Sequence, residues 1–134
     1  MTSKKFSHIV PFLHVRDLQE TIAYYRDKLG FYHEWFWGEK DAGIERDDIH
    51  LLFNLSPEYI RLANKSDLHF EFIWFVKNVD GIYKEYQKKG VEILREIEDK
   101  PWGGREFTIF DINGYSIRIA EGKRKKTEIN SDSP

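Results

Sequence analysis

The sequence contains no cysteine and no long run of apolar residues. The absence of cysteine excludes disulfide bonds, thiolate nucleophiles and cysteine-ligated zinc. No apolar stretch approaches the roughly 20 residues that a membrane-spanning helix needs, and the residues after Met1 lack the apolar stretch of a signal peptide. We therefore expect a cytoplasmic protein with no membrane partner.

Neither sign of charge is in large excess, because 21 basic residues face 23 acidic ones and the net charge is -2. This balance argues against a nucleic-acid partner. The chain also lacks the glycine-rich phosphate loops of nucleotide-binding proteins and the Gly-X-Ser-X-Gly motif of serine hydrolases. With 134 residues, of which 40% are hydrophobic and 16% aromatic, it is long enough and apolar enough for one domain with a real core.

The first part of the chain predicts one strand, one helix and three further strands. Residues 6–15 alternate as a strand does, with both faces largely apolar. Asp17 is a typical helix N-cap, Glu20 completes a capping box and Gly30 suits a helix end, which predicts a helix over residues 17–29. Short extended segments follow at residues 31–37, 43–46 and 49–55.

The same order then returns. A strand over residues 68–76 leads to a second cap at Asn78, a helix that ends at Gly90, and strands at residues 91–97, 106–111 and 115–121. Val15–Leu18 matches Val76–Val79 at an offset of 61. We predict an α+β fold of two βαβββ modules within residues 1–121: module 1 at about 6–55, a linker with a short helix at 56–67, and module 2 at about 68–121. Residues 122–134 are predicted to form a polar, disordered tail.

Three segments and one loop carry a resemblance to a known family. They are Val10–Leu18, Tyr24–Phe31, Asp111–Ile119 and the run Lys100–Phe107. Together they resemble the vicinal oxygen chelate superfamily of glyoxalases, extradiol dioxygenases and bleomycin-resistance proteins, and the loop resembles the bleomycin-resistance branch in particular. The resemblance implies that each module curls its sheet into half of a cup, and that the protein is a homodimer.

The metal-binding positions of the family can be carried over onto this sequence. They fall on Val10, Glu71, Arg118, and either Leu51 or Leu52. Because only Glu71 could donate to a divalent ion, the resemblance predicts no catalytic metal and no cofactor. Glu71 and Arg118 are expected to form an ion pair instead.

A displaced metal site is the alternative. His8 shares strand parity with Val10, and His69 shares it with Glu71, so His8, His69 and Glu71 could together supply three ligands. Such a site would favour a metal-dependent lyase or dioxygenase of the same fold.

The aromatic residues favour a binding protein. Trp102 lies between Pro101 and two glycines, in a predicted loop. A large ring on an exposed loop usually packs against a ligand or another surface. The resemblance implies that the matching tryptophan stacks on a planar drug. We therefore expect a small planar organic ligand at a dimer groove, with stacking by Trp102 and by Trp35 or Trp37, and polar contacts from Glu71, Arg105 and Arg118. A second alternative is a dimeric interaction module without a ligand, in which the aromatic face is only the subunit interface.

Overall fold

A computed structural model of the chain describes residues 3–68 and 70–122. The chain divides into two compact units, Met1–Leu62 and Ala63–Pro134. Each unit contains one four-stranded mixed sheet. The boundary falls inside helix α2 (Pro57–Ser66), so each unit is a complete sheet with its own helix packed on it.

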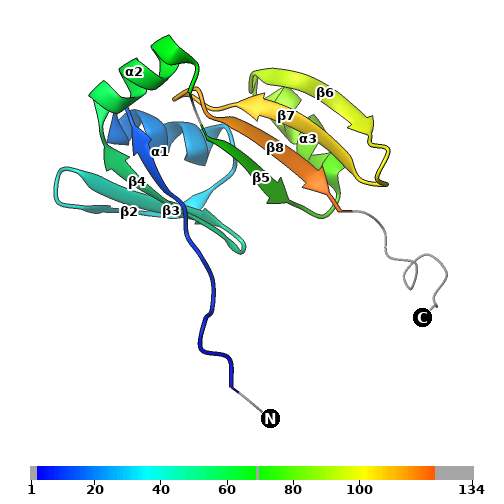
Figure 1. Cartoon of the computed structure of the whole chain (residues 1–134), viewed down its shortest axis with the longest axis horizontal. Coiled ribbons are helices and arrows are strands. Elements are labelled where there is room, and N and C mark those ends of the chain that lie inside the picture. Colours follow the sequence, from blue (N-terminus) through cyan, green and yellow to red (C-terminus); the bar gives the residue numbers. More distant parts are fainter. Residues whose placement is uncertain (1–2, 69, 123–134) are drawn as a thin grey trace. The chain divides into compact units, whose positions relative to one another are not determined.

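The first unit has the order strand, helix, three strands (Figure 1). These elements are β1 (Phe12–Val15), α1 (Leu18–Asp27), β2 (Tyr32–Trp37), β3 (Asp41–Arg46) and β4 (Ile49–Leu55). The sheet order is β1-β4-β3-β2, with β1 parallel to β4 and the other pairs antiparallel. Helix α1 begins where predicted, because the Asp17 carboxylate accepts the backbone N–H of Glu20 at 2.7 Å.

The first sheet has two chemically different faces. Its helix face packs against α1, where the ring of Tyr25 lies 5.2 Å from that of Phe53. This face carries the buried side chains Leu13, Val15, Ala42, Ile44, Leu51 and Phe53. Because side chains alternate along a strand, the intervening residues point to the opposite face, among them Phe12, His14, Trp35, Asp41, Gly43, Glu45, His50, Leu52 and Asn54.

The second unit repeats this arrangement (Figure 1). It contains β5 (Glu71–Phe75), α3 (Val79–Lys88), β6 (Ile93–Asp99), β7 (Arg105–Phe110) and β8 (Ser116–Glu121). The sheet order is β5-β8-β7-β6, and β5 runs parallel to β8. Helix α3 packs on Phe107, whose ring lies 4.9 Å from that of Tyr83. The helix face also buries Ile109, Ile117 and Ile119, while the opposite face carries Glu71, Ile73, Glu106, Thr108, Ser116 and Arg118.

The predicted α+β fold of two βαβββ modules is confirmed, but the first strand of each module is shorter than predicted, since β1 begins at Phe12 and β5 at Glu71. Residues 6–11 belong to no strand, although the Pro11 carbonyl accepts the backbone N–H of Leu52 at 3.1 Å. The alternation of residues 6–15 gave no sign of this, because pairing depends on β4, whose register reaches only from Leu52 to Leu55. The tail was predicted to be disordered over residues 122–134, and residues 123–134 lie outside the part of the chain that the structure describes.

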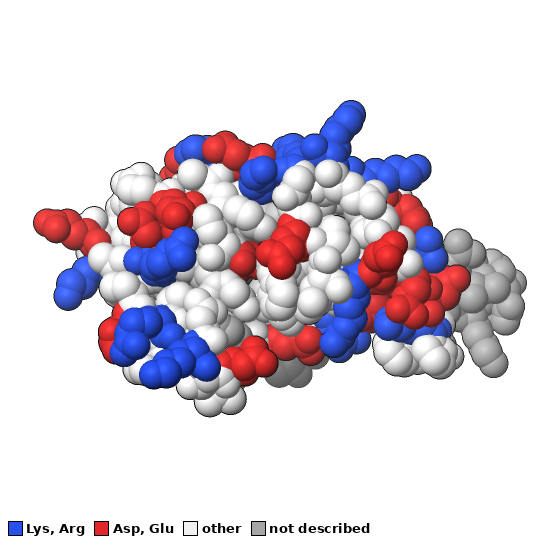
Figure 2. All heavy atoms as spheres, turned by 90° about the horizontal axis from the view of Figure 1, so that it is seen from above, with Lys and Arg blue, Asp and Glu red and all other residues white. Residues whose placement is uncertain are grey.

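No helix within residues 3–68 and 70–122 is both long and apolar enough to cross a membrane. Figure 2 shows acidic and basic side chains next to one another on the face drawn, as the near balance of charges predicts.

Candidate functional site

Trp35 lies flat on the first sheet. It is paired with Gly43 of β3, and a Cβ built on Gly43 would come within 2.5 Å of the indole. The ring therefore occupies the space that a side chain at this position would fill. Because 45% of Trp35 is nevertheless exposed, the ring offers free surface on the side away from the sheet.

A row of apolar residues continues from Trp35 across the opposite face. Gly43 is paired with Leu52, and Leu52 with Phe12, so the row crosses all four strands. Phe12 is 57% exposed. Trp37 is 75% exposed and has the same parity as Trp35, whereas Phe36 points to the helix face. The structure thus places Trp35 and Trp37 on one face, as the alternation predicts.

One side of this apolar row is bordered by a carboxylate between two histidines. Nδ1 of His33 donates to Glu45 at 2.7 Å, and Nδ1 of His50 lies 3.0 Å from the other oxygen of Glu45. The hydrogen bond from His33 is the main cause that lowers the pKa of Glu45, and the charge of His50 adds to it. Glu45 is therefore ionised at neutral pH.

The other side of the row is bordered by a chain of hydrogen bonds. Asn54 donates its amide to Asp41 at 2.9 Å, and the Ser56 hydroxyl donates to the Asn54 carbonyl at 2.7 Å. Since the Ser56 proton is used there, Nδ1 of His14 donates to the Ser56 oxygen, at 2.9 Å. The opposite face of the first sheet thus carries the carboxylates of Glu45 and Asp41 beside an apolar row. None of the residues assigned to this face in the previous section is Lys or Arg.

Trp102 lies in the tight loop between β6 and β7. The N–H of Gly103 donates to the Lys100 carbonyl at 2.9 Å, and the N–H of Lys100 donates to the Gly104 carbonyl at 2.8 Å. Gly103 has φ +100°, a value that L side chains rarely adopt. The indole rests beside Gly104, where a Cβ would lie 3.2 Å from its Nε1, and Trp102 is 54% exposed. The predicted exposed tryptophan loop is therefore present.

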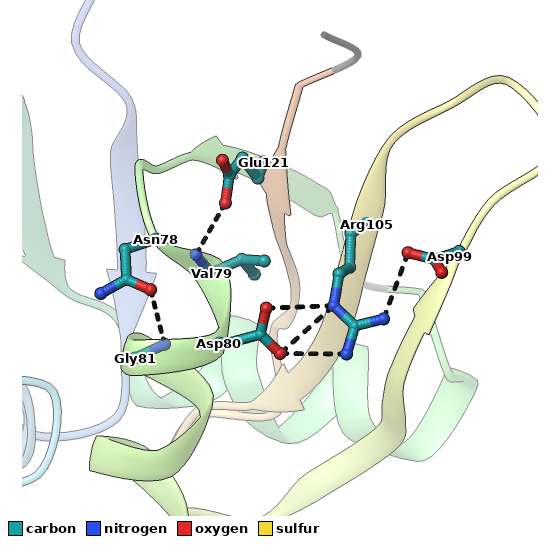
Figure 3. A network of polar contacts seen from close by, with 7 residues as sticks. All are labelled: Asn78, Val79, Asp80, Gly81, Asp99, Arg105 and Glu121. Carbon is teal, nitrogen blue, oxygen red and sulfur yellow. Dashed lines mark hydrogen bonds and ion pairs between the residues drawn. The ribbon is translucent and has the colours of Figure 1, made fainter.

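Arg105 lies on the helix face of the second sheet (Figure 3). Its guanidinium donates to Asp80 of α3 at 3.0 Å and to Asp99 of β6 at 3.1 Å. The hydrogen bond from Arg105 lowers the pKa of Asp80. Arg105 thus ties the beginning of α3 to two strands, and it lies on the other side of the sheet from Arg118.

Arg118 has a different partner from the one predicted. Its Nε and Nη2 donate to the two carboxylate oxygens of Glu106 at 2.8 and 3.0 Å, whereas Glu71 accepts the Ser116 hydroxyl at 3.2 Å. The expected ion pair of Glu71 with Arg118 is therefore wrong. Register is the reason: Arg118 is paired with Thr108 of β7, so Glu106 is within reach, and Glu71 is paired with Ser116. Glu71 still contributes to raising the pKa of Arg118.

The Glu106–Arg118 pair predicts a loss of stability in acid. Glu106 is 6% exposed, and the hydrogen bond from Arg118 lowers its pKa despite the opposing effect of burial. A carboxyl with a lowered folded-state pKa stabilises the fold above its unfolded pKa of about 4.3, and this contribution is lost as pH falls through the folded value. In urea unfolding from pH 7 to pH 3, the gap between wild type and Glu106→Gln should narrow below about pH 4.5. A gap independent of pH would contradict the pairing.

The described residues do not form the alternative metal site of His8, His69 and Glu71. His69 lies outside the described residues, and His8 belongs to the first unit, where its ring accepts from or donates to Ser7 at 2.7 Å. Among residues 3–68 and 70–122, no group of three His, Asp or Glu side chains could hold a metal ion.

Reasoning from the sequence missed several residues of the site region, among them Gly43, Glu106 and the two carboxylates beside the apolar row, Glu45 and Asp41. Gly43 sits in a strand, where a glycine often marks a close approach, and this signal was available. Glu106 could be recognised only from the strand register.

The comparisons with known proteins agree with the fold. The model of the Glyoxalase/Bleomycin resistance protein/Dioxygenase superfamily matches residues 5–119. A bleomycin resistance determinant encoded on the transposon Tn5 is similar in structure, with a TM-score of 0.75, 23% identity and coverage of 89% of this chain and 100% of that one. A bleomycin-binding protein from Streptomyces verticillus, solved with copper(II)-bleomycin, has a TM-score of 0.71, 24% identity and coverage of 90% and 100%.

A third similar structure is TioX from Micromonospora sp. ML1, with a TM-score of 0.67, 21% identity and coverage of 89% and 98%. The search of curated proteins gave no match. These solved structures support the fold, and the family model covers most of the chain. The chain belongs to the Glyoxalase/Bleomycin resistance protein/Dioxygenase superfamily.

Proposed function

We propose that this protein is a metal-free cytoplasmic binding protein of bleomycin-resistance type, which sequesters a flat organic molecule. The observation that carries the proposal is the indole of Trp35, held flat over Gly43 with 45% of the residue exposed. A ring fixed in this way needs little ordering to stack on a planar ligand. A homodimer is part of the proposal, because the resemblance implies one.

Charge favours a ligand that carries positive charge or hydrogen-bond donors. The carboxylates of Glu45 and Asp41 border the apolar row on its two sides. The positive charges of Arg105 and Arg118 do not oppose such a ligand, because both residues have acidic partners. Bleomycin, which the similar protein from Streptomyces verticillus binds as its copper(II) complex, is therefore the first compound to test.

The other predicted site residues receive secondary roles in the proposal. Trp37 and Trp102 present further exposed rings. Glu71 and Arg118 provide polar groups on the opposite face of the second sheet. Arg105 acts as a positioning residue, because its contact with Asp99 fixes the base of the loop that carries Trp102.

Replacing Trp35 should weaken binding strongly. Truncation of a tryptophan that anchors a ligand costs about 2 kcal/mol or more, so Trp35→Ala should raise the Kd of bleomycin about 30-fold in calorimetric titration. Gly43→Val should have a similar effect, because its side chain displaces the indole. Phe36→Ala is the matched control, since Phe36 is a neighbouring exposed ring on the other face of the sheet.

Two results would overturn the proposal. One is an unchanged Kd in both Trp35→Ala and Gly43→Val. The other is the absence of binding heat with bleomycin and with other planar cationic compounds.

A further inference from the structure

The two sheets place different chemistry at equivalent positions. In the first sheet, one row across the four strands consists of Phe12, Leu52, Gly43 and Trp35. The corresponding row of the second sheet consists of Ile73, Arg118, Thr108 and Arg95. Three apolar or aromatic side chains around a glycine are thus replaced by one apolar side chain, two guanidinium groups and a hydroxyl.

Thr108 is the central residue of the second row. It is 2% exposed and points to the opposite face, because its neighbours Phe107 and Ile109 pack on the helix side. Among the described residues, no hydrogen bond uses its hydroxyl. Two other buried polar side chains show the usual behaviour, since Glu106 pairs with Arg118, and Asp111 accepts the N–H of Asn113. A buried hydroxyl without a partner is uncommon and requires an explanation.

Arg118 presents unused donors beside this hydroxyl. Its Nε and Nη2 are occupied by Glu106, which leaves the N–H groups of Nη1 without an acceptor among the residues described. The neighbouring strands are about 4.8 Å apart, so Arg118 and Thr108 can reach the same small group. The raised pKa of Arg118 keeps the guanidinium charged.

Arg95 supplies a second cation on the other side of Thr108. It is paired with Thr108 across β6 and β7, and it is close enough to Glu106 to help lower the pKa of that carboxyl. It is exposed and forms no ion pair within the described part of the chain. Arg118 pairs with Glu106 and also lies near the carboxylate of Glu71, so Arg95 is the guanidinium of this row that has no carboxylate partner among the described residues.

We propose that Arg95, Thr108 and Arg118 form a binding site for the carboxylate group of a small organic acid. A carboxylate accepts hydrogen bonds from hydroxyl and guanidinium groups, and this row offers both kinds of donor. A metal ion does not fit, because the row offers donors and positive charge. The inference rests on the proposed function for Arg118, which has a polar role there, and goes beyond it by adding Arg95, Thr108 and the chemical class of the bound group.

The test is a titration of the full-length protein with benzoate, followed by NMR of the arginine Nε–H groups and the Thr108 amide. Benzamide, which has the same ring and no charge, is the control ligand. Benzoate should shift the signals of Arg95, Thr108 and Arg118, and benzamide should not. A hydrogen bond to a charged group contributes enough that Thr108→Val should weaken benzoate binding about tenfold.

Thr108→Val also separates a binding role from a structural one. The change keeps the shape of the side chain and removes a buried hydroxyl without a partner, so its melting temperature should equal or exceed that of wild type. Arg95→Gln should weaken benzoate binding and reduce its dependence on salt. Wild-type affinity in Thr108→Val, no benzoate binding by wild type, or equal binding of benzamide would each overturn the inference. None of these results bears on Trp35, whose variants are tested with bleomycin.

Discussion

Arg118→Met should destabilise the protein by about 3 kcal/mol or more, because it leaves a buried charge without its partner. The side chain of Glu106 is 7% exposed, and its carboxylate receives two hydrogen bonds from Arg118. Methionine retains most of the apolar contact of the arginine stem and removes both donors. Urea unfolding at pH 7 measures the loss as a lower midpoint.

A double variant distinguishes the buried charge from lost packing. When Glu106→Leu is added to Arg118→Met, no charge remains buried, and replacing both members of a buried pair is often nearly neutral. We therefore expect the double variant to recover most of the lost stability. If it is no more stable than Arg118→Met, the loss comes from packing and the account of the pair is wrong.

Phe107→Ala should cost about 3–5 kcal/mol, the usual range for removing a buried phenylalanine. Phe107 is 1% exposed, and its ring contacts Tyr83 and Tyr86 of α3 at centroid distances of 4.9 and 6.3 Å. These contacts are made in the centre of the helix face, so the cavity left by alanine cannot be filled from solvent. Chemical unfolding followed by circular dichroism measures the effect.

Phe107→Leu is the matched control for this cavity. Leucine fills part of the space and keeps an apolar contact with α3, so its cost should be clearly smaller than that of alanine. A loss below about 1 kcal/mol in Phe107→Ala would show that α3 does not depend on this residue.

The helices were predictable because their signals are local. Asp17 and Asn78 were identified as caps from the sequence, and both side chains accept a backbone N–H three residues on, from Glu20 and Gly81. The repeat was visible in the sequence at an offset of 61 residues, because each copy needs the same helix cap at the same distance from its strand. The order of helices and strands along the chain followed from the repeat.

The polar contacts across the sheets were not predictable in the same way. Parity assigns Arg118 and Glu71 to one face, but it does not say which residue of the next strand lies opposite. The pairing of β7 with β8 brings Glu106 to Arg118, and a helix brings Asp80 to Arg105. Such contacts depend on register and on helix packing, and a single sequence carries no direct signal for either.

The irregular pairing of β2 with β3 has a consequence for association. β2 is the last strand of its sheet, all six of its residues are exposed, and its sequence YHEWFW is rich in aromatic rings. A straight strand of this composition would be a template for intermolecular β-pairing and aggregation. The register shift after Tyr32, with His33 at φ +57°, distorts the outer edge and disfavours the addition of a further strand. The chain can thus keep several large rings on its surface while remaining protected against fibril-like growth along this strand.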